Sequence, residues 1–491
     1  MSSYKNIIKS TGLVASVQVV SIICHIVRNK VVAIVLGASG FGIWGLYNTF
    51  IETAASFSSL GLNQSGVRQI AKSDDAVVIA KCIWVFRRSM ILTSLVTALI
   101  SIVFSKTISM ALFNTEDYYL GVIIVSFTIF CRGISRGQVA VLNGLRDMRG
   151  LAISQIIGTI TGSITCIMLV FLFGVQGIPI YLLAVGITAV LSTWWFVRKL
   201  KIKSIRPPRE ETVKELKQLL SLGLGFSVAG LIAAVMTGLS QIFLRKNYDL
   251  DAVGIYRASW TISNIYIGTI LTAMGVDFMP RIMKLINKPK KLNSVTNEQI
   301  ELGVLVSTIG AVGILIFSPL VLHILYSSEF TVGIKIIRWQ VLGVIMRVIA
   351  FPFSYIIMAY NRPGIYATIQ VIFWTTDFLL LILFSTLFGF DGLGINYFVA
   401  YILYLSLTFA VCCKICGFMF SKFSIKIFSI SSAFIVAAWL VSQYLQKYNY
   451  LIGSILVIGA GIWMFLYLKK YMRINVIQLL HAKILKKMST R

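Results

Sequence analysis

The sequence predicts an all-α protein that crosses a membrane with about fourteen helices. Three observations support this prediction. Of the 491 residues, 57% are hydrophobic and only 13% are charged, about half the charged fraction of a typical soluble domain. The mean hydropathy is +0.86. The basic residues, which bring the net charge to +28, stand in short segments between long apolar runs, a pattern typical of membrane topology and not of nucleic-acid binding.

The predicted spans follow from the length of the apolar runs, because a helix needs about 20 apolar residues to cross the hydrocarbon. The first half of the chain predicts spans at residues 12–36, 41–62, 89–105, 118–141, 151–173 and 178–197. The second half predicts spans at residues 218–243, 253–280, 301–322, 336–360, 365–388 and 394–417. Two further spans, at residues 427–444 and 451–468, complete the fourteen.

The distribution of Lys and Arg predicts the orientation of these spans. With the N-terminus in the cytoplasm, the cytoplasmic segments carry 33 Lys and Arg and the outer segments carry 5. Cytoplasmic loops of membrane proteins are enriched in these residues, so both termini are expected in the cytoplasm. The basic N-terminal segment has no small-residue cleavage site after it and predicts an uncleaved first helix, not a signal peptide.

The first half of the chain recurs in the second half at an offset of 211 to 215 residues. FGIW at Phe41–Trp44 corresponds to VGIY at Val253–Tyr256, and Arg132 corresponds to Arg347. Each repeat holds six spans, an even number, so a pseudo-twofold axis along the membrane normal should relate two six-helix lobes. Such lobes enclose a cleft that can open to either side, which is the geometry of alternating access.

The predicted domains follow from this repeat. They are an N-terminal lobe over residues 1–197, a cytoplasmic linker over 198–217, a C-terminal lobe over 218–418, and two extra helices with a basic cytoplasmic tail over 419–491. Within the linker, Pro207 and Pro208 precede EETVKELKQL, which predicts a short surface helix. The segments between spans are too short for a soluble catalytic domain.

Ionisable residues within the predicted spans are the candidate functional residues, because a mid-bilayer Arg or Lys costs about 2.5 to 3.5 kcal/mol on insertion scales. The candidate substrate-binding cations are Arg28, Lys30, Arg132, Arg136, Arg257 and Arg347. The acids within spans are Glu52, Asp277 and Asp377, so cations are in excess. Arg28, Arg132 and Arg347 lie deepest and are expected to line a cavity. Lys30 and a seventh cation, Arg338, lie near outer span ends, where snorkelling to water is an alternative.

The deeper arginines have two open interpretations. Arg132 and Arg136 are four residues apart and share one helix face, so they would form a ladder of positive charge along one wall of a cavity. Arg132 and Arg347 could equally be structural ions, held by Glu52 or Asp377 across the lobes.

Glu52 also has two open interpretations. It belongs to a polar stripe that comprises Asn48, Glu52, Ser56 and Ser59. Its counterpart in the second repeat is Asn264, so only one lobe carries an acid at this position. The carboxylate could couple transport to a proton or another cation, or it could be the salt-bridge partner of Arg28. Glu52 and Asp377 are the candidate coupling residues.

No catalytic residue, metal site or bound cofactor is predicted. The seven cysteines show no disulfide framework, and the CxxC formed by Cys413 and Cys416 lacks a second pair of ligands. The GxGxxG at Gly40–Gly45 has no preceding strand, so it predicts a tight turn and close packing. No Walker A sequence is present, and coupling to an H⁺ or Na⁺ gradient is expected in place of ATP.

Several motifs carry a resemblance to a known family: KVVAIVLGASGFGIWGL (Lys30–Leu46), LFNTEDY (Leu112–Tyr118), NGLRDMRG (Asn143–Gly150), DAVGIYRASWTISN (Asp251–Asn264) with FMPRIMKL after it, and SSEFTVGIKIIRWQVLG (Ser327–Gly343). The chain resembles the Wzx-type O-antigen and lipid-linked oligosaccharide flippases over about residues 1–420. These form the polysaccharide transporter branch of the multidrug/oligosaccharidyl-lipid/polysaccharide exporter superfamily.

The resemblance implies a V-shaped pair of lobes with a cationic central cavity for the pyrophosphate of an undecaprenyl-linked oligosaccharide. Cations of helices 1 and 8 are typical of that cavity, and Arg28, Lys30 and Arg257 occupy matching places. The resemblance also implies a bacterial inner membrane protein, with the lipid-linked oligosaccharide and the bilayer as partners, polysaccharide assembly proteins as candidate partners, and no nucleic acid. The last two spans exceed the twelve that are common in this branch.

The residues support the same interpretation physically, because a lipid pyrophosphate offers acceptors that arginine can meet bidentately. One alternative is a multidrug exporter of the same superfamily. Its usual cargo is cationic and would predict acidic cavity residues. A second alternative is an oligosaccharide polymerase or ligase, which would be expected to carry a long outer loop with charged catalytic residues.

Overall fold

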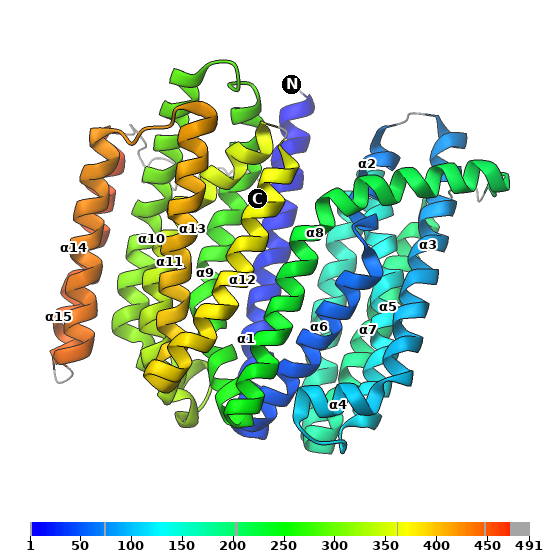
Figure 1. Ribbon diagram of the computed structural model, residues 1–491, viewed down its shortest axis with the longest axis horizontal. Helices are drawn as coiled ribbons and strands as arrows, with labels where there is room; N and C mark the ends of the chain where they lie inside the picture. Colours follow the sequence, from blue (N-terminus) through cyan, green and yellow to red (C-terminus); the bar gives the residue numbers. More distant parts are fainter. Residues whose placement is uncertain are drawn as a thin grey trace, which may run out of the picture. The chain divides into compact units, whose positions relative to one another are not determined.

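The computed structural model describes residues 2–72, 75–200, 202, 205–360, 362–445 and 448–471, and over these residues it is helical without strands (Figure 1). The first elements are α1 (Ser2–Ser59), α2 (Leu62–Lys72), α3 (Ala76–Val103), α4 (Ser105–Phe113), α5 (Tyr119–Gly144), α6 (Met148–Phe173), η1 (Gly174–Gln176), α7 (Gly177–Lys199) and α8 (Arg209–Asn247). They are followed by α9 (Leu250–Met283), α10 (Pro289–Leu325), η2 (Ser328–Gly333), α11 (Ile334–Ala359), α12 (Pro363–Phe388), η3 (Gly389–Asp391), α13 (Gly392–Cys416), α14 (Lys422–Tyr444) and α15 (Asn449–Tyr471).

The predicted spans all coincide with helices. Among the described residues, ten stretches are long and apolar enough to cross a membrane. Three of these stretches, Val20–Ser59, Met148–Lys199 and Pro363–Cys416, each cover most or all of two predicted spans. Helix α9 contains the predicted span at residues 253–280. The predicted all-α, multi-pass membrane fold is confirmed.

The first two predicted spans are joined within α1. At Gly37 the backbone leaves the helical region, with φ of 67° and ψ of −169°, so α1 consists of two helices that meet between the first two predicted spans. Glycine is suited to this position because a Cβ atom disfavours positive φ. The tight turn predicted for Gly40–Gly45 is wrong, because these residues are helical. Residues 38–59 form the second helix, which carries Trp44 and Glu52.

The predicted surface helix and the seventh span form one element, α8. It begins after Pro207 and Pro208, and Glu210 and Glu211 in its first turn complement the positive end of the helix dipole. Figure 1 shows the first part of α8 crossing the ends of α2 and α3 at a large angle to the rest of the helix. An ion pair of 2.8 Å between Lys81 Nζ and Glu211 Oε2 holds it to α3.

The contacts divide the chain into two compact units. Unit 1 comprises Met1–Ala258, Leu322–Val332 and Gln370–Ile382, and unit 2 comprises Ser259–Val321, Gly333–Ile369 and Leu383–Arg491. The domain boundaries at residues 197 and 217 rest on the sequence repeat and remain a prediction. The basic tail over residues 472–491 lies outside the described residues.

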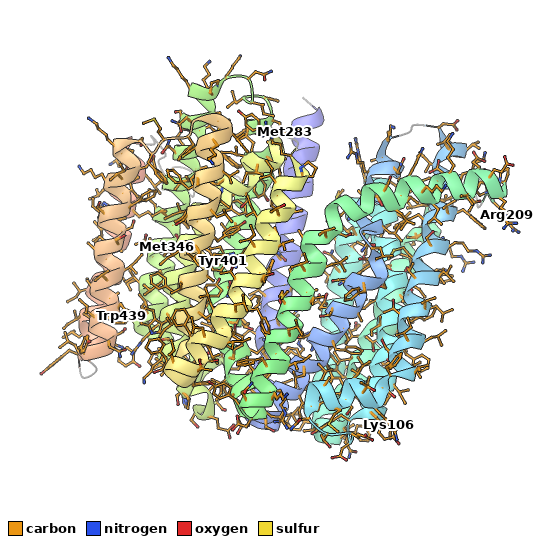
Figure 2. All side chains as sticks on the ribbon, viewed as in Figure 1. Lys106, Arg209, Met283, Met346, Tyr401 and Trp439 are labelled. Carbon is orange, nitrogen blue, oxygen red and sulfur yellow. The ribbon has the colours of Figure 1, made fainter. Side chains whose placement is uncertain are left out.

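Unit 1 has a hydrophobic core at the end where α2 lies. Leu62 and Ile70 of α2 are buried there with Phe86 of α3, Val141 of α5 and Leu219 of α8. In Figure 2, Arg209 of α8 and Lys106 of α4 lie at opposite ends of this unit. This agrees with the charge distribution, which puts these two residues on opposite sides of the membrane.

Two glycines at equivalent positions of the sequence repeat make close contacts in unit 1. A Cβ atom on Gly42 would clash with the carbonyl oxygen of Leu250, and a Cβ atom on Gly254 would clash with the carbonyl oxygen of Ala38. Gly42 and Gly254 are repeat equivalents, and so are Ala38 and Leu250. The two glycines therefore allow the start of α9 and the second half of α1 to approach each other closely.

Unit 2 contains the two helices that lie outside the repeat. Arg338 Nη1 of α11 donates a hydrogen bond of 2.8 Å to Gln443 Oε1 of α14. Asn449 Nδ2, at the start of α15, donates a hydrogen bond of 3.0 Å to the carbonyl oxygen of Ile316 in α10. Polar contacts therefore fasten both extra helices to the remainder of unit 2, and Arg338 serves this packing in place of snorkelling to water.

Candidate cationic site

The first part of the candidate site surrounds Trp44, a buried residue in the second half of α1. The guanidinium carbon Cζ of Arg28 lies 5.3 Å from the centroid of the Trp44 ring, and that of Arg257 lies 5.0 Å from it. A guanidinium group over an indole ring gains cation–π energy, most strongly away from water. Trp44 thus brings together two of the predicted cations, although sequence reasoning did not select it as a site residue.

Arg257 is also held by the backbone of α1. Its Nη1 donates hydrogen bonds to the carbonyl oxygen of Gly45 at 3.0 Å and to Thr49 Oγ1 at 3.4 Å. A Cβ atom on Gly45 would lie 2.7 Å from Arg257 Cδ, so the glycine makes room for the arginine. Gly45 and Arg257 occupy equivalent positions of the repeat, at the same offset as Gly42 and Gly254. The sequence contains a signal for this contact: when the repeats are aligned, GIWG corresponds to GIYR, so a glycine stands where the other repeat has an arginine.

The two candidate cations of α1, Arg28 and Lys30, have different surroundings. Arg28 lies over the Trp44 ring together with Arg257. Its Nε atom is buried and has no hydrogen-bond partner in the described part of the chain. Lys30 Nζ donates a hydrogen bond of 3.2 Å to the carbonyl oxygen of His323. Lys30 is therefore anchored at the end of α10, a contact that the sequence did not predict.

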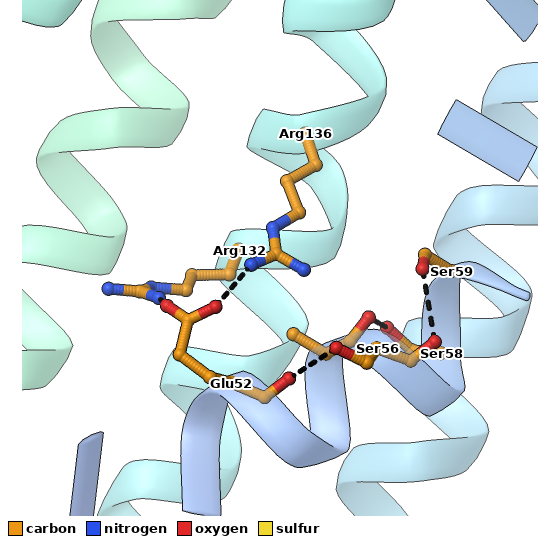
Figure 3. A network of polar contacts seen from close by, with 7 residues as sticks. Glu52, Ser56, Ser58, Ser59, Arg132 and Arg136 are labelled. Carbon is orange, nitrogen blue, oxygen red and sulfur yellow. Dashed lines mark hydrogen bonds and ion pairs between the residues drawn. The ribbon is translucent and has the colours of Figure 1, made fainter. Parts of the chain in front are cut away.

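The second part of the site is centred on the carboxylate of Glu52 (Figure 3). Arg132 Nη1 forms an ion pair with Glu52 Oε1, and Arg136 Nη2 lies 2.6 Å from Glu52 Oε2. The two arginines extend from one face of α5, as their spacing of four residues predicts. From the sequence, both Arg28 and Arg132 are candidate ion-pair partners of the Glu52 carboxylate. In the structure, Arg132 and Arg136 form these ion pairs.

The rest of the predicted polar stripe bonds to its own helix. The Ser56 hydroxyl donates to the carbonyl oxygen of Glu52 at 2.8 Å, and the Ser59 hydroxyl donates to that of Ser56 at 3.0 Å. Asn48 Nδ2 donates to the carbonyl oxygen of Trp44 at 2.8 Å. In these contacts, Glu52 is the stripe residue whose side chain bonds to another helix, α5.

Unit 2 contains the equivalent contact of the second repeat. Arg347 Nη1 donates a hydrogen bond of 2.6 Å to Asn264 Oδ1, which also accepts one of 2.8 Å from the Tyr397 hydroxyl. The Arg347 guanidinium lies 5.8 Å from the Tyr401 ring centroid. Since Arg347 and Asn264 correspond to Arg132 and Glu52, the repeat preserves the contact and replaces the carboxylate with an amide.

The charge balance of unit 1 suits an anion. Its predicted spans contain Arg28, Lys30, Arg132, Arg136 and Arg257, five cations, against Glu52 and Asp377, two acids. Asp377 lies in the Gln370–Ile382 segment of this unit. The side chain of Asp277 lies outside the described residues. Over the described residues, no group of three or more His, Cys, Asp or Glu could hold a metal ion.

A sequence profile described as "Polysaccharide biosynthesis protein" matches residues 7–286, more than half of the chain. The chain belongs to this family. Among curated proteins, the lipid III flippases of Escherichia coli (strain K12) and Shigella flexneri are similar to it. Each is 24% identical over 421 residues, which are 83% of this chain and 97% of the relative.

Solved structures share the fold of this polysaccharide biosynthesis family member. The lipid II flippase MurJ in an inward closed conformation superposes with a TM-score of 0.72 at 16% identity, covering 94% of this chain and 100% of that chain. A multidrug resistance MATE family transporter of the MOP superfamily superposes with a TM-score of 0.67 at 15% identity, covering 81% and 95%. These relatives are named as flippases and a transporter, in agreement with the prediction that this chain is not an enzyme.

Proposed function

We propose that this chain flips an undecaprenyl-pyrophosphate-linked oligosaccharide repeat unit of the O-antigen type across the bacterial inner membrane. Both termini lie in the cytoplasm, and transport proceeds by alternating access. Arg28, Arg132, Arg136, Arg257 and Arg347 bind the anionic headgroup, with Lys30 at the outer end of the first span. The lipid III and lipid II flippases among the similar proteins support a lipid-linked cargo.

The observation that carries this proposal is the arrangement of Arg28 and Arg257 over Trp44. Two guanidinium groups held by one aromatic ring repel each other, and a polyanion bound between them removes that repulsion. A pyrophosphate carries several oxygen acceptors that guanidinium forks meet bidentately. The multidrug exporter alternative is less well supported, because a cationic drug would meet a surplus of positive charge in unit 1.

We further propose that an H⁺ or Na⁺ gradient drives transport, with Glu52 and Asp377 as the coupling carboxylates. Flipping in proteoliposomes should then respond to an imposed ion gradient and proceed without ATP. Transport that requires ATP while the ion gradients are clamped would refute this coupling.

Complementation of a flippase-null strain tests the proposed function. Arg28→Ala and Arg257→Ala should abolish surface polysaccharide at normal protein levels in the membrane, because each removes a headgroup ligand. Arg257→Lys should retain part of the activity, since lysine keeps the charge and loses the bidentate fork. Normal surface polysaccharide from a stably expressed double Ala variant would falsify the cationic-site mechanism.

A further inference from the structure

A pocket of about 530 Å³ with both apolar and polar lining lies within unit 1, between α2 and the end of α5 that packs on it. Its polar lining comes from Asn63 and Gln64 in the first turn of α2, and from Ser135, Arg136 and Asn143 of α5. Small-molecule sites in proteins typically enclose roughly 300 to 1,000 Å³. The pocket is therefore large enough for a small organic group, and it adjoins the α5 face that carries Arg132 and Arg136.

The chemistry of this lining favours a neutral polyhydroxylated ligand. Each carboxamide offers both donors and an acceptor, the combination that sugar hydroxyl groups require. The Oδ1 atom of Asn63 is buried and has no hydrogen-bond partner among the described residues. A buried acceptor without a partner costs free energy, and a hydroxyl or amide donor on a ligand would satisfy it.

Arg136 connects this pocket with the cationic site. Its side chain lines the pocket, and its Nη2 atom lies 2.6 Å from Glu52 Oε2 (Figure 3). A phosphate group would compete with the Glu52 carboxylate for the same guanidinium donors. In a lipid-linked oligosaccharide, the first sugar is bonded directly to the pyrophosphate. A pyrophosphate that binds Arg136 therefore holds its first sugar next to the pocket.

We infer that the pocket between α2 and α5 is a subsite for this first sugar, with the amides of Asn63, Gln64 and Asn143 as its hydrogen-bonding groups. The inference rests on the proposed function. It adds a part of the site that recognises the hydroxyl and amide groups of the sugar and does not depend on the charge of the pyrophosphate. The arginines then bind every polyprenyl pyrophosphate, and the amides discriminate between headgroups.

Equilibrium binding to the purified full-length chain tests this subsite. The probes are undecaprenyl pyrophosphate and two derivatives that carry a single glucose or a single N-acetylglucosamine. The wild-type chain should bind at least one of the derivatives about tenfold more tightly than the bare lipid, the gain expected from about two additional neutral hydrogen bonds. The double variant Asn63→Leu, Asn143→Leu should bind all three lipids with the wild-type affinity for the bare lipid.

Two further variants make the result specific. Gln64 is exposed, so Gln64→Ala should fold normally and lose part of the preference for the sugar-bearing lipid even if the double variant does not fold. Gln69→Leu is the matched control, because Gln69 is a half-buried amide of the same helix that bonds Gln218 outside the pocket. It should retain the full preference.

The outcomes separate the two proposals. Equal wild-type affinity for all three lipids, or an undiminished preference in a folded pocket variant, would overturn the subsite and leave the flippase proposal standing. Failure of the wild-type chain to bind any of the three lipids would overturn both proposals.

Discussion

The arginines of the predicted spans are held by three kinds of partner. Arg257 contacts the Trp44 ring and the carbonyl oxygen of Gly45, Arg132 pairs with a carboxylate, and Arg347 bonds an amide. A neutral partner orients a guanidinium group without cancelling its charge, whereas a carboxylate cancels it. The contacts of Arg347 and Arg132 therefore differ in charge: Asn264 leaves the Arg347 charge uncancelled, whereas a headgroup that binds Arg132 would have to compete with Glu52.

At the residue scale, Gly45→Ala should impair transport. The added Cβ would lie 2.7 Å from Arg257 Cδ, so the arginine must leave its place over Trp44. A displaced Arg257 no longer offers its guanidinium to the headgroup, and a hydrogen bond to a charged group is worth about 1.5 to 3 kcal/mol, so headgroup affinity should fall about tenfold or more. Binding of undecaprenyl pyrophosphate to the purified variant measures this effect.

The control for Gly45→Ala is Gly158→Ala. No atom lies within 4 Å of a Cβ built on Gly158 of α6, so the variant should bind the lipid with wild-type affinity. Equal affinities of the Gly45 and Gly158 variants would show that the position of Arg257 does not matter for headgroup binding.

At the scale of the elements, the two helices that carry Trp44 and Arg257 each begin at a carboxylate. Asp249 Oδ1 accepts a hydrogen bond of 2.7 Å from the Ala252 amide at the start of α9, which is ordinary N-capping. At the equivalent break in α1, Glu329 Oε2 of η2 accepts one of 3.0 Å from the Ala38 amide. The cap of the second half of α1 is therefore supplied by a residue 291 positions away.

The break within α1 predicts that Gly37→Ala lowers the thermal stability of the protein. The backbone of Gly37 lies in a region that is essentially restricted to glycine and costs another residue about 1 to 3 kcal/mol, and the alanine Cβ would lie 3.1 Å from Glu329 Oε2. The variant should unfold at a lower temperature than the wild type, as measured by thermal unfolding in detergent. Gly230→Ala in α8 is the control, because nothing lies within 4 Å of its Cβ position. An unchanged unfolding temperature for Gly37→Ala would mean that this break is not required.

At the scale of the whole molecule, an all-helical multi-pass fold is combined with strongly asymmetric charge. The predicted spans coincide with helices, and the predicted cytoplasmic segments carry 33 of the 45 Lys and Arg. Helices α14 and α15, which lie outside the repeat, are fastened to unit 2 by the polar contacts of Arg338 and Asn449. They are therefore an integral part of unit 2, whatever they add to transport.

The charge asymmetry predicts which residues face outward. In a cysteine-free background, a membrane-impermeant maleimide should label Lys106→Cys in intact cells and should label Arg209→Cys only after permeabilisation. The physical reason is the retention of Lys and Arg on the cytoplasmic side. Labelling of Arg209→Cys in intact cells, at normal protein level, would contradict the predicted orientation.

The sequence by itself determined the fold class, the spans and the repeat. Bilayer thickness sets the length of an apolar run, so the spans can be read locally. The cost of burying charge marks the candidate residues, which is why Arg28, Arg132 and Arg257 could be selected before any contact was known. The repeat also predicted that Arg347 and Asn264 stand where Arg132 and Glu52 stand, and both pairs are in contact.

Only the tertiary structure decided which residues are partners. Glu52 pairs with Arg132 and Arg136, and Trp44 holds Arg28 and Arg257. The cap from Glu329 and the pocket at Asn63 also carried no signal in the sequence pattern. Apolar periodicity does not set the rotation of one helix against another, since lipid tails are as apolar as the side chains that face them. Close packing of glycines and a few polar contacts decide that rotation, and these join residues far apart in the chain.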